Sequence, residues 1–508
     1  MIVSQKQDPR RNSTPFRLMG LLLAAGLAAF GSTACTTVGP DYIPPENTAP
    51  AAWKTTPPSG LTTENADMEL LKQWWTCFND STLNTLIGQA IQNNLDLQTA
   101  ASRVRQARSQ RAISQAGLFP TLNFSGSATH NDSRSESQQM GTVETNSNRY
   151  STGFDVNWEL DVFGGVRRSV EASDKDLQSR EASLYDVLVS LTAEVALNYV
   201  NARAYQTRLD LAEANLRIQK ETLELVESKF QAELIDELPV QQARYGYENT
   251  ASQIPALRAS LNETLNHLDT LLGQTPGFVH ERLEKHEPIP LLPPSVAVGA
   301  PSEALRRRPD IRKAEMDLAA QTARIGVAVA DLYPKFYLSG SLSRQGTGTL
   351  GFRKYATDAW SLGPSVSWNV FDTGATRANV EVQKEVREQD LIAYKSAILN
   401  ALEEVENKMY AFGQQQARRE RLAAAVTAAQ NAVQLAQEQY KVGKVAFTDV
   451  LNAEQSLVSY QDQVAQSESI MVTDLISLFK ALGGGWSPAD SPAGPQREAI
   501  QEGSANHE

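Results

Sequence analysis

The sequence contains few of the residues on which enzyme and metal sites usually depend. There are two cysteines and five histidines in 508 residues. His267, His280 and His286 lack the spacing of metal ligands. No Gly-x-Ser-x-Gly nucleophile motif stands where a strand would run into a helix. The Gly-x-Gly-x-x-Gly stretch at residues 346–351 lies between two expected strands rather than in a βαβ unit. We therefore expect no enzyme, no cofactor and no metal.

Positive charge is also scarce, because 47 Lys and Arg stand against 59 Asp and Glu, a net charge of −12. A nucleic-acid surface needs clustered positive charge, so a nucleic-acid partner is excluded. Aromatic residues make up only 7% of the chain. Ala, Gln, Glu and Leu are plentiful instead, which is typical of long helices.

The apolar run at residues 18–30 is too short to span a bilayer comfortably. Three arginines precede it and small residues follow it, the pattern of an export signal. Cys35 comes directly after the small residues, which resembles a bacterial lipoprotein cleavage site. That resemblance implies that Cys35 is lipidated, and Thr36 in place of Asp fits sorting to the outer membrane.

A soluble exported form is the alternative, because Ser32 stands where such cleavage sites usually carry Leu. If Cys35 carries lipid, Cys77 has no partner and is expected to be a small apolar filler.

The chain contains two copies of one design, since the stretch from Phe119 to Ser127 matches that from Tyr333 to Ser341. A stretch rich in proline joins the two copies. The expected divisions are a signal peptide (1–34), a lipidated tether (35–75), repeat 1 (76–275), a linker (276–301), repeat 2 (302–482) and a flexible tail (483–508).

Each repeat contains two segments in which apolar and polar residues alternate. These segments are 121–129, 150–161, 336–343 and 361–370. Alternation with period two predicts strands. The face opposite the apolar one is nearly all Ser, Asn and acid, as a water-filled lumen requires. The polar stretches 130–148 and 344–357 between the strands are expected to be exposed loops.

A long helix free of proline follows each strand pair, at about residues 167–231 and 377–442. At 1.5 Å per residue each would be about 100 Å long, which only a bundle or a tube can bury. A second helix follows in each repeat. Every seventh residue is apolar from Val240 to Leu268 and again from Val450 to Leu478, which predicts coiled-coil seams. An earlier helix is expected from about Asp80 to a point before Pro120.

Four strands in one chain cannot close a barrel, and lipid tolerates no open sheet edge. Two copies would give eight strands, and side chains would fill the interior of a barrel of that size. Three copies would give a trimeric 12-stranded β-barrel with an aqueous bore. The expected fold class is therefore mainly α with a transmembrane β part, in which this barrel joins a long α-helical barrel.

Four motifs carry a resemblance to a known family: residues 37–42 (TVGPDY), the pair Trp74-Trp75, residues 308–311 (RPDI) and the stretch from Gly326 to Pro334. With them the chain resembles the TolC-like outer-membrane factors, and most closely the OprM/NodT-type efflux lipoproteins. The resemblance covers nearly everything from Cys35 to about residue 485. It implies a homotrimer in outer-membrane lipid that extends into the periplasm. It also implies a periplasmic adaptor and an inner-membrane RND-type pump as partners.

The resemblance implies a passive exit duct for drugs or other small molecules, gated at the periplasmic helix tips. The matching gate residues are Tyr440, Gly443, Asp449 and Asn452. Asp449 has an alternative role as an acid that stabilises the start of the last helix. Where some relatives carry a basic residue this chain has Val445, which puts an ion-pair gate in doubt.

Two other functions fit the same pattern. One is a type I protein-secretion conduit of the same fold. The other is a trimeric structural lipoprotein that transports nothing, which would pack its centre dry instead of lining it with polar groups.

Overall fold

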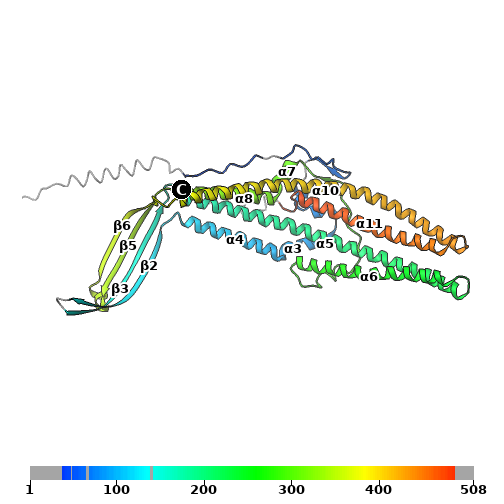
Figure 1. Cartoon of the computed structure of the whole chain (residues 1–508), viewed down its shortest axis with the longest axis horizontal. Coiled ribbons are helices and arrows are strands. Elements are labelled where there is room, and N and C mark those ends of the chain that lie inside the picture. The colour runs from blue at the N-terminus through cyan, green and yellow to red at the C-terminus, as the bar shows by residue number, and fades with distance from the viewer. Residues whose placement is uncertain (1–36, 47–48, 65–67, 138–140, 487–508) are drawn as a thin grey trace, which may run out of the picture. The chain divides into compact units, whose positions relative to one another are not determined.

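The computed structural model describes residues 37–46, 49–64, 68–137 and 141–486. The predicted signal peptide, Cys35 and the tail from residue 487 lie outside them. The chain is built from long helices and a four-stranded sheet (Figure 1). It divides into two compact units. The first comprises the described part of Met1–Ile43 with Ser109–Lys175 and Ala319–Gln389, and the second Pro44–Arg108, Asp176–Leu318 and the described part of Asp390–Glu508.

The first unit contains the sheet, which is antiparallel with the strand order β2-β3-β5-β6. Its strands are β2 (Thr121–Ser137), β3 (Gly141–Leu160), β5 (Lys335–Thr347) and β6 (Thr357–Ser367). The two repeats meet between β3 and β5. Trp158 Nε1 donates to the carbonyl of Leu118 at 3.0 Å, and Trp368 Nε1 donates to the carbonyl of Leu332 at 3.1 Å. This shared contact confirms the internal repeat.

The prediction of two loops between the strands is largely wrong. In the first repeat, β2 and β3 pair as far as Ser137 opposite Gly141, so strand occupies nearly all of 130–148. In the second, β5 reaches Thr347 and α9 (Gly348–Lys354) takes up most of the remainder. Antiparallel pairing joins backbone groups, so polar side chains on both faces do not end a ladder.

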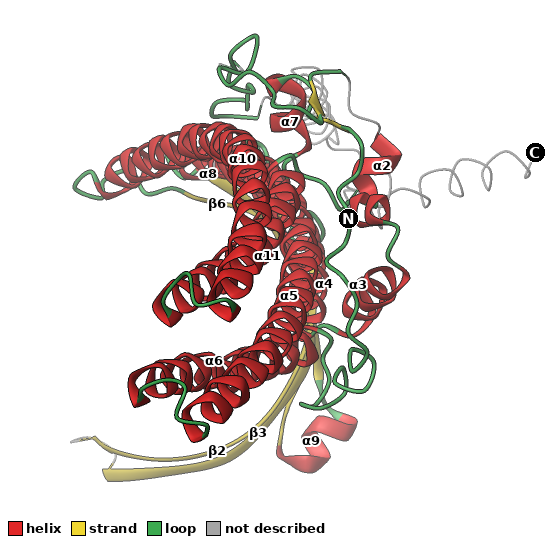
Figure 2. Ribbon diagram, turned by 90° about the vertical axis from the view of Figure 1, so that its right-hand side faces the viewer, coloured by secondary structure: helices red, strands yellow, loops and turns green. Residues whose placement is uncertain are grey.

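The long helices have matched lengths in the two repeats. Helices α5 (Gly165–Gln231) and α10 (Ala375–Lys441) have 67 residues each, and α6 (Glu237–Leu271) and α11 (Phe447–Ala481) have 35 each. The limits predicted for the two long helices are thus confirmed within about two residues. Figure 2 shows the pairs α5–α6 and α10–α11 lying side by side, and ion pairs join the two helices of each pair.

The helix expected from Asp80 is two helices, α3 (Ser81–Asn93) and α4 (Leu95–Ala116). Asn94 breaks it, because its Nδ2 donates to the carbonyl of Leu271 and its Oδ1 caps the N–H of Leu97, both at 2.9 Å. Asp80 caps the start of α3, because its Oδ1 accepts hydrogen bonds from the N–H groups of Thr82 and Leu83.

The second unit holds the main apolar core. Its smaller elements are β1 (Leu61–Thr62), α2 (Met68–Lys72), the 3₁₀ helix η1 (Trp74–Phe78), β4 (Val296–Ala297), α7 (Pro301–Arg307) and the start of α8 (Pro309–Ala330). Trp74 is fully buried and stacks on Phe479 with ring centroids 5.3 Å apart. Burying side chains of this size stabilises the fold by about 1.5–3 kcal/mol each.

Candidate functional site

The segment after the predicted lipid-attachment residue is bound firmly within the first unit. Cys35 itself lies outside the described residues. The N–H of Val38 donates to the carbonyl of Phe163 at 3.1 Å. Arg168, whose side chain is 5% exposed, donates from Nε to the carbonyl of Val38 at 3.1 Å and from Nη2 to Asp41 at 2.7 Å. The segment that follows Cys35 is thus held against Phe163 and Arg168, while acylation of Cys35 stays a prediction.

The sheet has one apolar face. Phe124, Phe154, Leu342 and Trp360 are successive partners in one row across all four strands. These four side chains are 47% to 78% exposed. A contiguous exposed apolar surface of this kind marks a membrane or protein contact.

The opposite face of the sheet is polar. Asp155, Ser341 and Ser361 are successive partners in a row on that face, and the two serine hydroxyls are 2.9 Å apart. Ser339 Oγ donates to Asn157 Oδ1 at 3.0 Å. The register therefore confirms the two-faced sheet expected from the alternation, with a polar face able to hydrogen-bond water.

Helices α5 and α6 form a first helical hairpin, and α10 and α11 form a second. At the tip of the second hairpin, α10 ends in a left-handed turn. Gly443 has a φ of +72°, and its N–H donates to the carbonyl of Tyr440 at 3.1 Å. The N–H of Lys444 donates to the carbonyl of Gln439 at 2.9 Å, which completes a Schellman motif. In the first hairpin Glu233 holds the equivalent place with a φ of +56°. A residue with a Cβ pays about 1–2 kcal/mol for that conformation.

Asp449 is the third residue of α11, and it is exposed. Its Oδ2 accepts a hydrogen bond from the N–H of Ala446 at 3.1 Å. This contact is the carboxylate half of a capping box, in a place where the helix dipole also favours negative charge. Asn452 is exposed on the next turn, and its carbonyl accepts from Ser456 Oγ at 2.8 Å. The gate role of both residues stays a prediction.

Tyr440 joins the two hairpins of the second unit. Lys229 Nζ on α5 lies 4.4 Å from the centroid of its ring, and the ring of Phe447 lies 5.4 Å away. Its hydroxyl is buried without a hydrogen-bond partner among the described residues, and burial raises the pKa of Tyr440. It packs on a buried cluster shared by both hairpins: Val226, Val240, Ala243, Phe447, Val450 and Leu451.

A polar seam between α5 and α11 was not expected from the sequence. Its contacts are Arg208 with Asp462 (2.6 Å), Asn215 with Gln461 (3.0 Å) and Thr222 with Glu454 (3.3 Å). Glu454 is only 5% exposed. It follows Val450 by four residues and so shares its helix face. An acid on that apolar face is the signal that could have revealed the seam.

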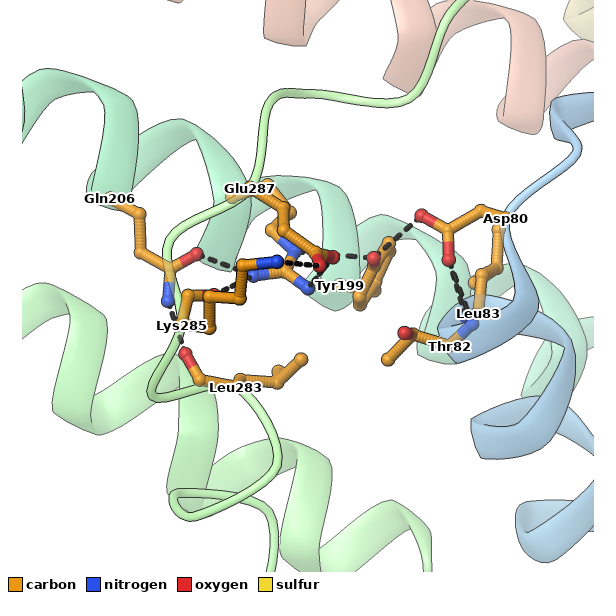
Figure 3. Close-up of polar contacts among 9 residues, drawn as sticks. Asp80, Thr82, Leu83, Tyr199, Gln206, Leu283, Lys285 and Glu287 are labelled. Carbon is orange, nitrogen blue, oxygen red and sulfur yellow. Dashed lines mark hydrogen bonds and ion pairs between the residues drawn. The ribbon is translucent and has the colours of Figure 1, made fainter.

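A second network attaches the proline-rich linker to α5 (Figure 3). Arg203 is 1% exposed and donates to the carbonyl of Lys285 and to Glu287, both at 2.8 Å. Its Nε donates to the hydroxyl of Tyr199 at 3.1 Å, and that hydroxyl donates to Asp80 at 2.6 Å. The linker and the start of α3 are thus fixed to one buried cation.

Two features are absent from the described residues. No group of three or more His, Cys, Asp and Glu residues there is placed to hold a metal ion. None of the helices there has the length and apolar character needed to cross a membrane.

Comparison with known proteins agrees with this geometry. The model of the outer membrane efflux protein family matches residues 86–274 and 300–484. Nodulation protein T of Rhizobium leguminosarum bv. trifolii is 35% identical, over 89% of this chain and 95% of its own. The cation efflux system protein CusC of Escherichia coli O6:H1 is 28% identical, over 93% and 99%.

Among solved structures, the outer-membrane channel OprN is 36% identical and superposes with a TM-score of 0.80, over 89% of this chain and all of that one. The predicted fold class, mainly helical with a four-stranded sheet in each chain and two repeats, is therefore confirmed. The matches extend over most of both repeats, so the chain belongs to the outer membrane efflux protein family.

Proposed function

We propose that three copies of this chain form an outer-membrane channel, the exit duct of a tripartite efflux system. The observation that carries the proposal is the register of the sheet, with one apolar and one polar face and with β2 and β6 at its open edges. Lipid cannot satisfy the backbone groups of those edges. Pairing β2 of one copy with β6 of the next closes a barrel whose polar face surrounds water.

The family supports a proposal for the cargo and the partners. Named relatives include a cation efflux system protein and a toluene efflux pump outer membrane protein, which favours small-molecule cargo over protein cargo. An inner-membrane RND-type pump would supply the energy and a periplasmic adaptor would bridge the gap. The chain itself would be a passive duct rather than an enzyme, anchored by lipid on Cys35.

The face that meets lipid is tested by two neighbouring residues of β6. Trp360→Lys places a charge on the apolar face, which costs about 2–4 kcal/mol in mid-membrane, so little protein should reach the outer membrane. Ser361→Lys, the matched control, places the same charge on the polar face. It should insert, assemble as trimers by native mass spectrometry and conduct with reduced cation preference. Equal insertion of both variants, or monomers that pass no current, would refute the proposal.

The gate role of Asp449 is tested by separating its charge from its cap. Asp449→Asn keeps an oxygen that can accept from Ala446 and removes the charge, whereas Asp449→Ala removes both. If an acidic ring narrows the periplasmic mouth, both variants change single-channel conductance and cation preference equally. If the residue only caps α11, both variants keep the wild-type conductance and cation preference. The Ala variant then loses more stability at the start of α11 than the Asn variant, which loses only the interaction of the charge with the helix dipole.

A further inference from the structure

Glu454 places a buried carboxyl group between three helices. It projects from α11, and its Oε1 accepts from Thr222 Oγ1 on α5 at 3.3 Å and from Gln437 Nε2 on α10 at 3.0 Å. Both donors are neutral. An ionised carboxylate here forms no ion pair with the described residues that would offset the loss of water, so the buried charge is costly.

The surroundings of Glu454 contain few charges. A cavity of about 220 Å³ adjoins its two partners, lined in part by Glu221, Thr222, Gln437, Tyr440 and Lys441. Glu221 and Lys441 are exposed, so water screens both. Helix α6 approaches α11 where Gly246 faces Leu451. Its nearby cation Arg244 is paired with Glu227 at 2.8 Å. Burial raises the pKa of the Glu454 carboxyl, against the opposing effect of its two hydrogen bonds.

The direction of the coupling follows from this environment. The packed state favours the protonated carboxyl more than a separated, hydrated state does. The stabilisation of the packed state is therefore complete below a pH of about 4.5, the ordinary value for Glu. The stabilisation is lost as the pH rises through the raised pKa that the Glu454 carboxyl has in the packed state.

We infer that Glu454 is a positioning residue for the tip: its proton holds the second hairpin against α5, and loss of the proton loosens that seam. The inference rests on the proposed channel function, because the loosened element would be the one that closes the periplasmic mouth. The tip would then open more readily at neutral pH than in acid.

The seam is tested without reference to transport. Glu454→Gln keeps the shape and the acceptor and cannot ionise. Hydrogen exchange of residues 447–460 is compared between this variant and wild type at the same pH, so that intrinsic exchange rates cancel. Exchange at pH 7 should be about tenfold slower in the variant, and the two proteins should agree at pH 4. Glu438→Gln, an exposed acid beside Gln437, is the matched control and should follow wild type at every pH.

The link to the gate is tested by the pH profile of conductance in planar bilayers. All variants are also measured in an Asp449→Asn background, because that carboxylate lies at the same tip. Current should rise with pH in wild type and Glu438→Gln and stay low in Glu454→Gln. Exchange that does not differ between Glu454→Gln and wild type would overturn the inference. Altered exchange with identical current profiles would overturn the link to the gate. An absence of current in every protein would instead refute the proposed channel function.

Discussion

Replacing Gly39 by Ala should detach the segment that follows the predicted lipid-attachment residue. Gly39 has a φ of +89°, and a Cβ built on it would lie 2.4 Å from the Cα of Gly326. The conformation alone costs a residue with a Cβ about 1–2 kcal/mol. The added Cβ would overlap with backbone atoms of α8, which cannot rotate away as a side chain can. The segment around residue 39 must therefore move away from α8.

Lifting removes contacts whose energies set the size of the effect. The bond from Val38 N–H to Phe163 is lost, as are the bonds from Arg168 to Val38 and Asp41. Bonds to charged groups contribute about 1.5–3 kcal/mol each when buried, but the Asp41 side chain is 86% exposed and its share is small. We expect local opening to become easier by about 2–4 kcal/mol, which speeds amide exchange at Val38 by about 30-fold to 1,000-fold.

A matched control separates backbone strain from overlap. Gly277 has a φ of +108°, but a Cβ built on it meets no atom within 4 Å. Gly277→Ala should therefore cost only the conformational part and change exchange at the nearby Val279 by about tenfold. Both proteins are measured by hydrogen exchange with mass spectrometry. If Gly39→Ala raises exchange at Val38 no more than Gly277→Ala does at Val279, contact with Gly326 does not hold the segment.

Three further predictions concern single residues. Asp80→Ala should destabilise the start of α3 by about 2–4 kcal/mol, because it removes the cap and the acceptor of Tyr199, whereas Asp80→Asn should lose less; exchange at the first turn of α3 measures both. Glu233→Gly should stabilise its turn by about 1 kcal/mol, seen as slower local exchange, and Gly443→Ala should do the reverse. Burial raises the pKa of Cys77 to about 12, so at pH 8 only about one thiol in 10,000 is ionised and alkylation should be slow until the protein is denatured; fast labelling of the native protein would contradict this.

The sequence predicted the elements whose signal is local and periodic. The alternation around Phe124 and Phe154 and the seven-residue step from Val450 gave the strands and the seam helices. Identical helix lengths in the two repeats follow from the duplication. The extension of β2 to Ser137 was missed because its polar residues carry no period, although its backbone pairs as well as any other.

The polar contacts could not be predicted for a different reason. Arg203 meets Lys285 and Glu287 across 82 and 84 residues, and Thr222 meets Glu454 across 232. Pairs so distant in sequence depend on how the helices pack, which no local pattern specifies. Of the predicted tip residues, Tyr440 and Gly443 take definite structural roles. Asp449 makes the helix-capping contact foreseen as its alternative role, and its gate role stays a prediction.

The seam between α5 and α11 suggests how one hairpin can separate from the other. Each of its hydrogen bonds contributes only about 0.5–1.5 kcal/mol net, because water replaces it when the helices part. The apolar cluster at the tip has no such replacement: burial of Phe447, Val450 and Leu451 contributes about 1.5–3 kcal/mol for each side chain. The cluster therefore supplies most of the force that holds the hairpins together, and the polar seam sets a smaller margin that a proton on Glu454 or a partner at the tip can change. A seam with an apolar end and a polar middle therefore combines firm packing at the tip with polar contacts that a change of charge can weaken.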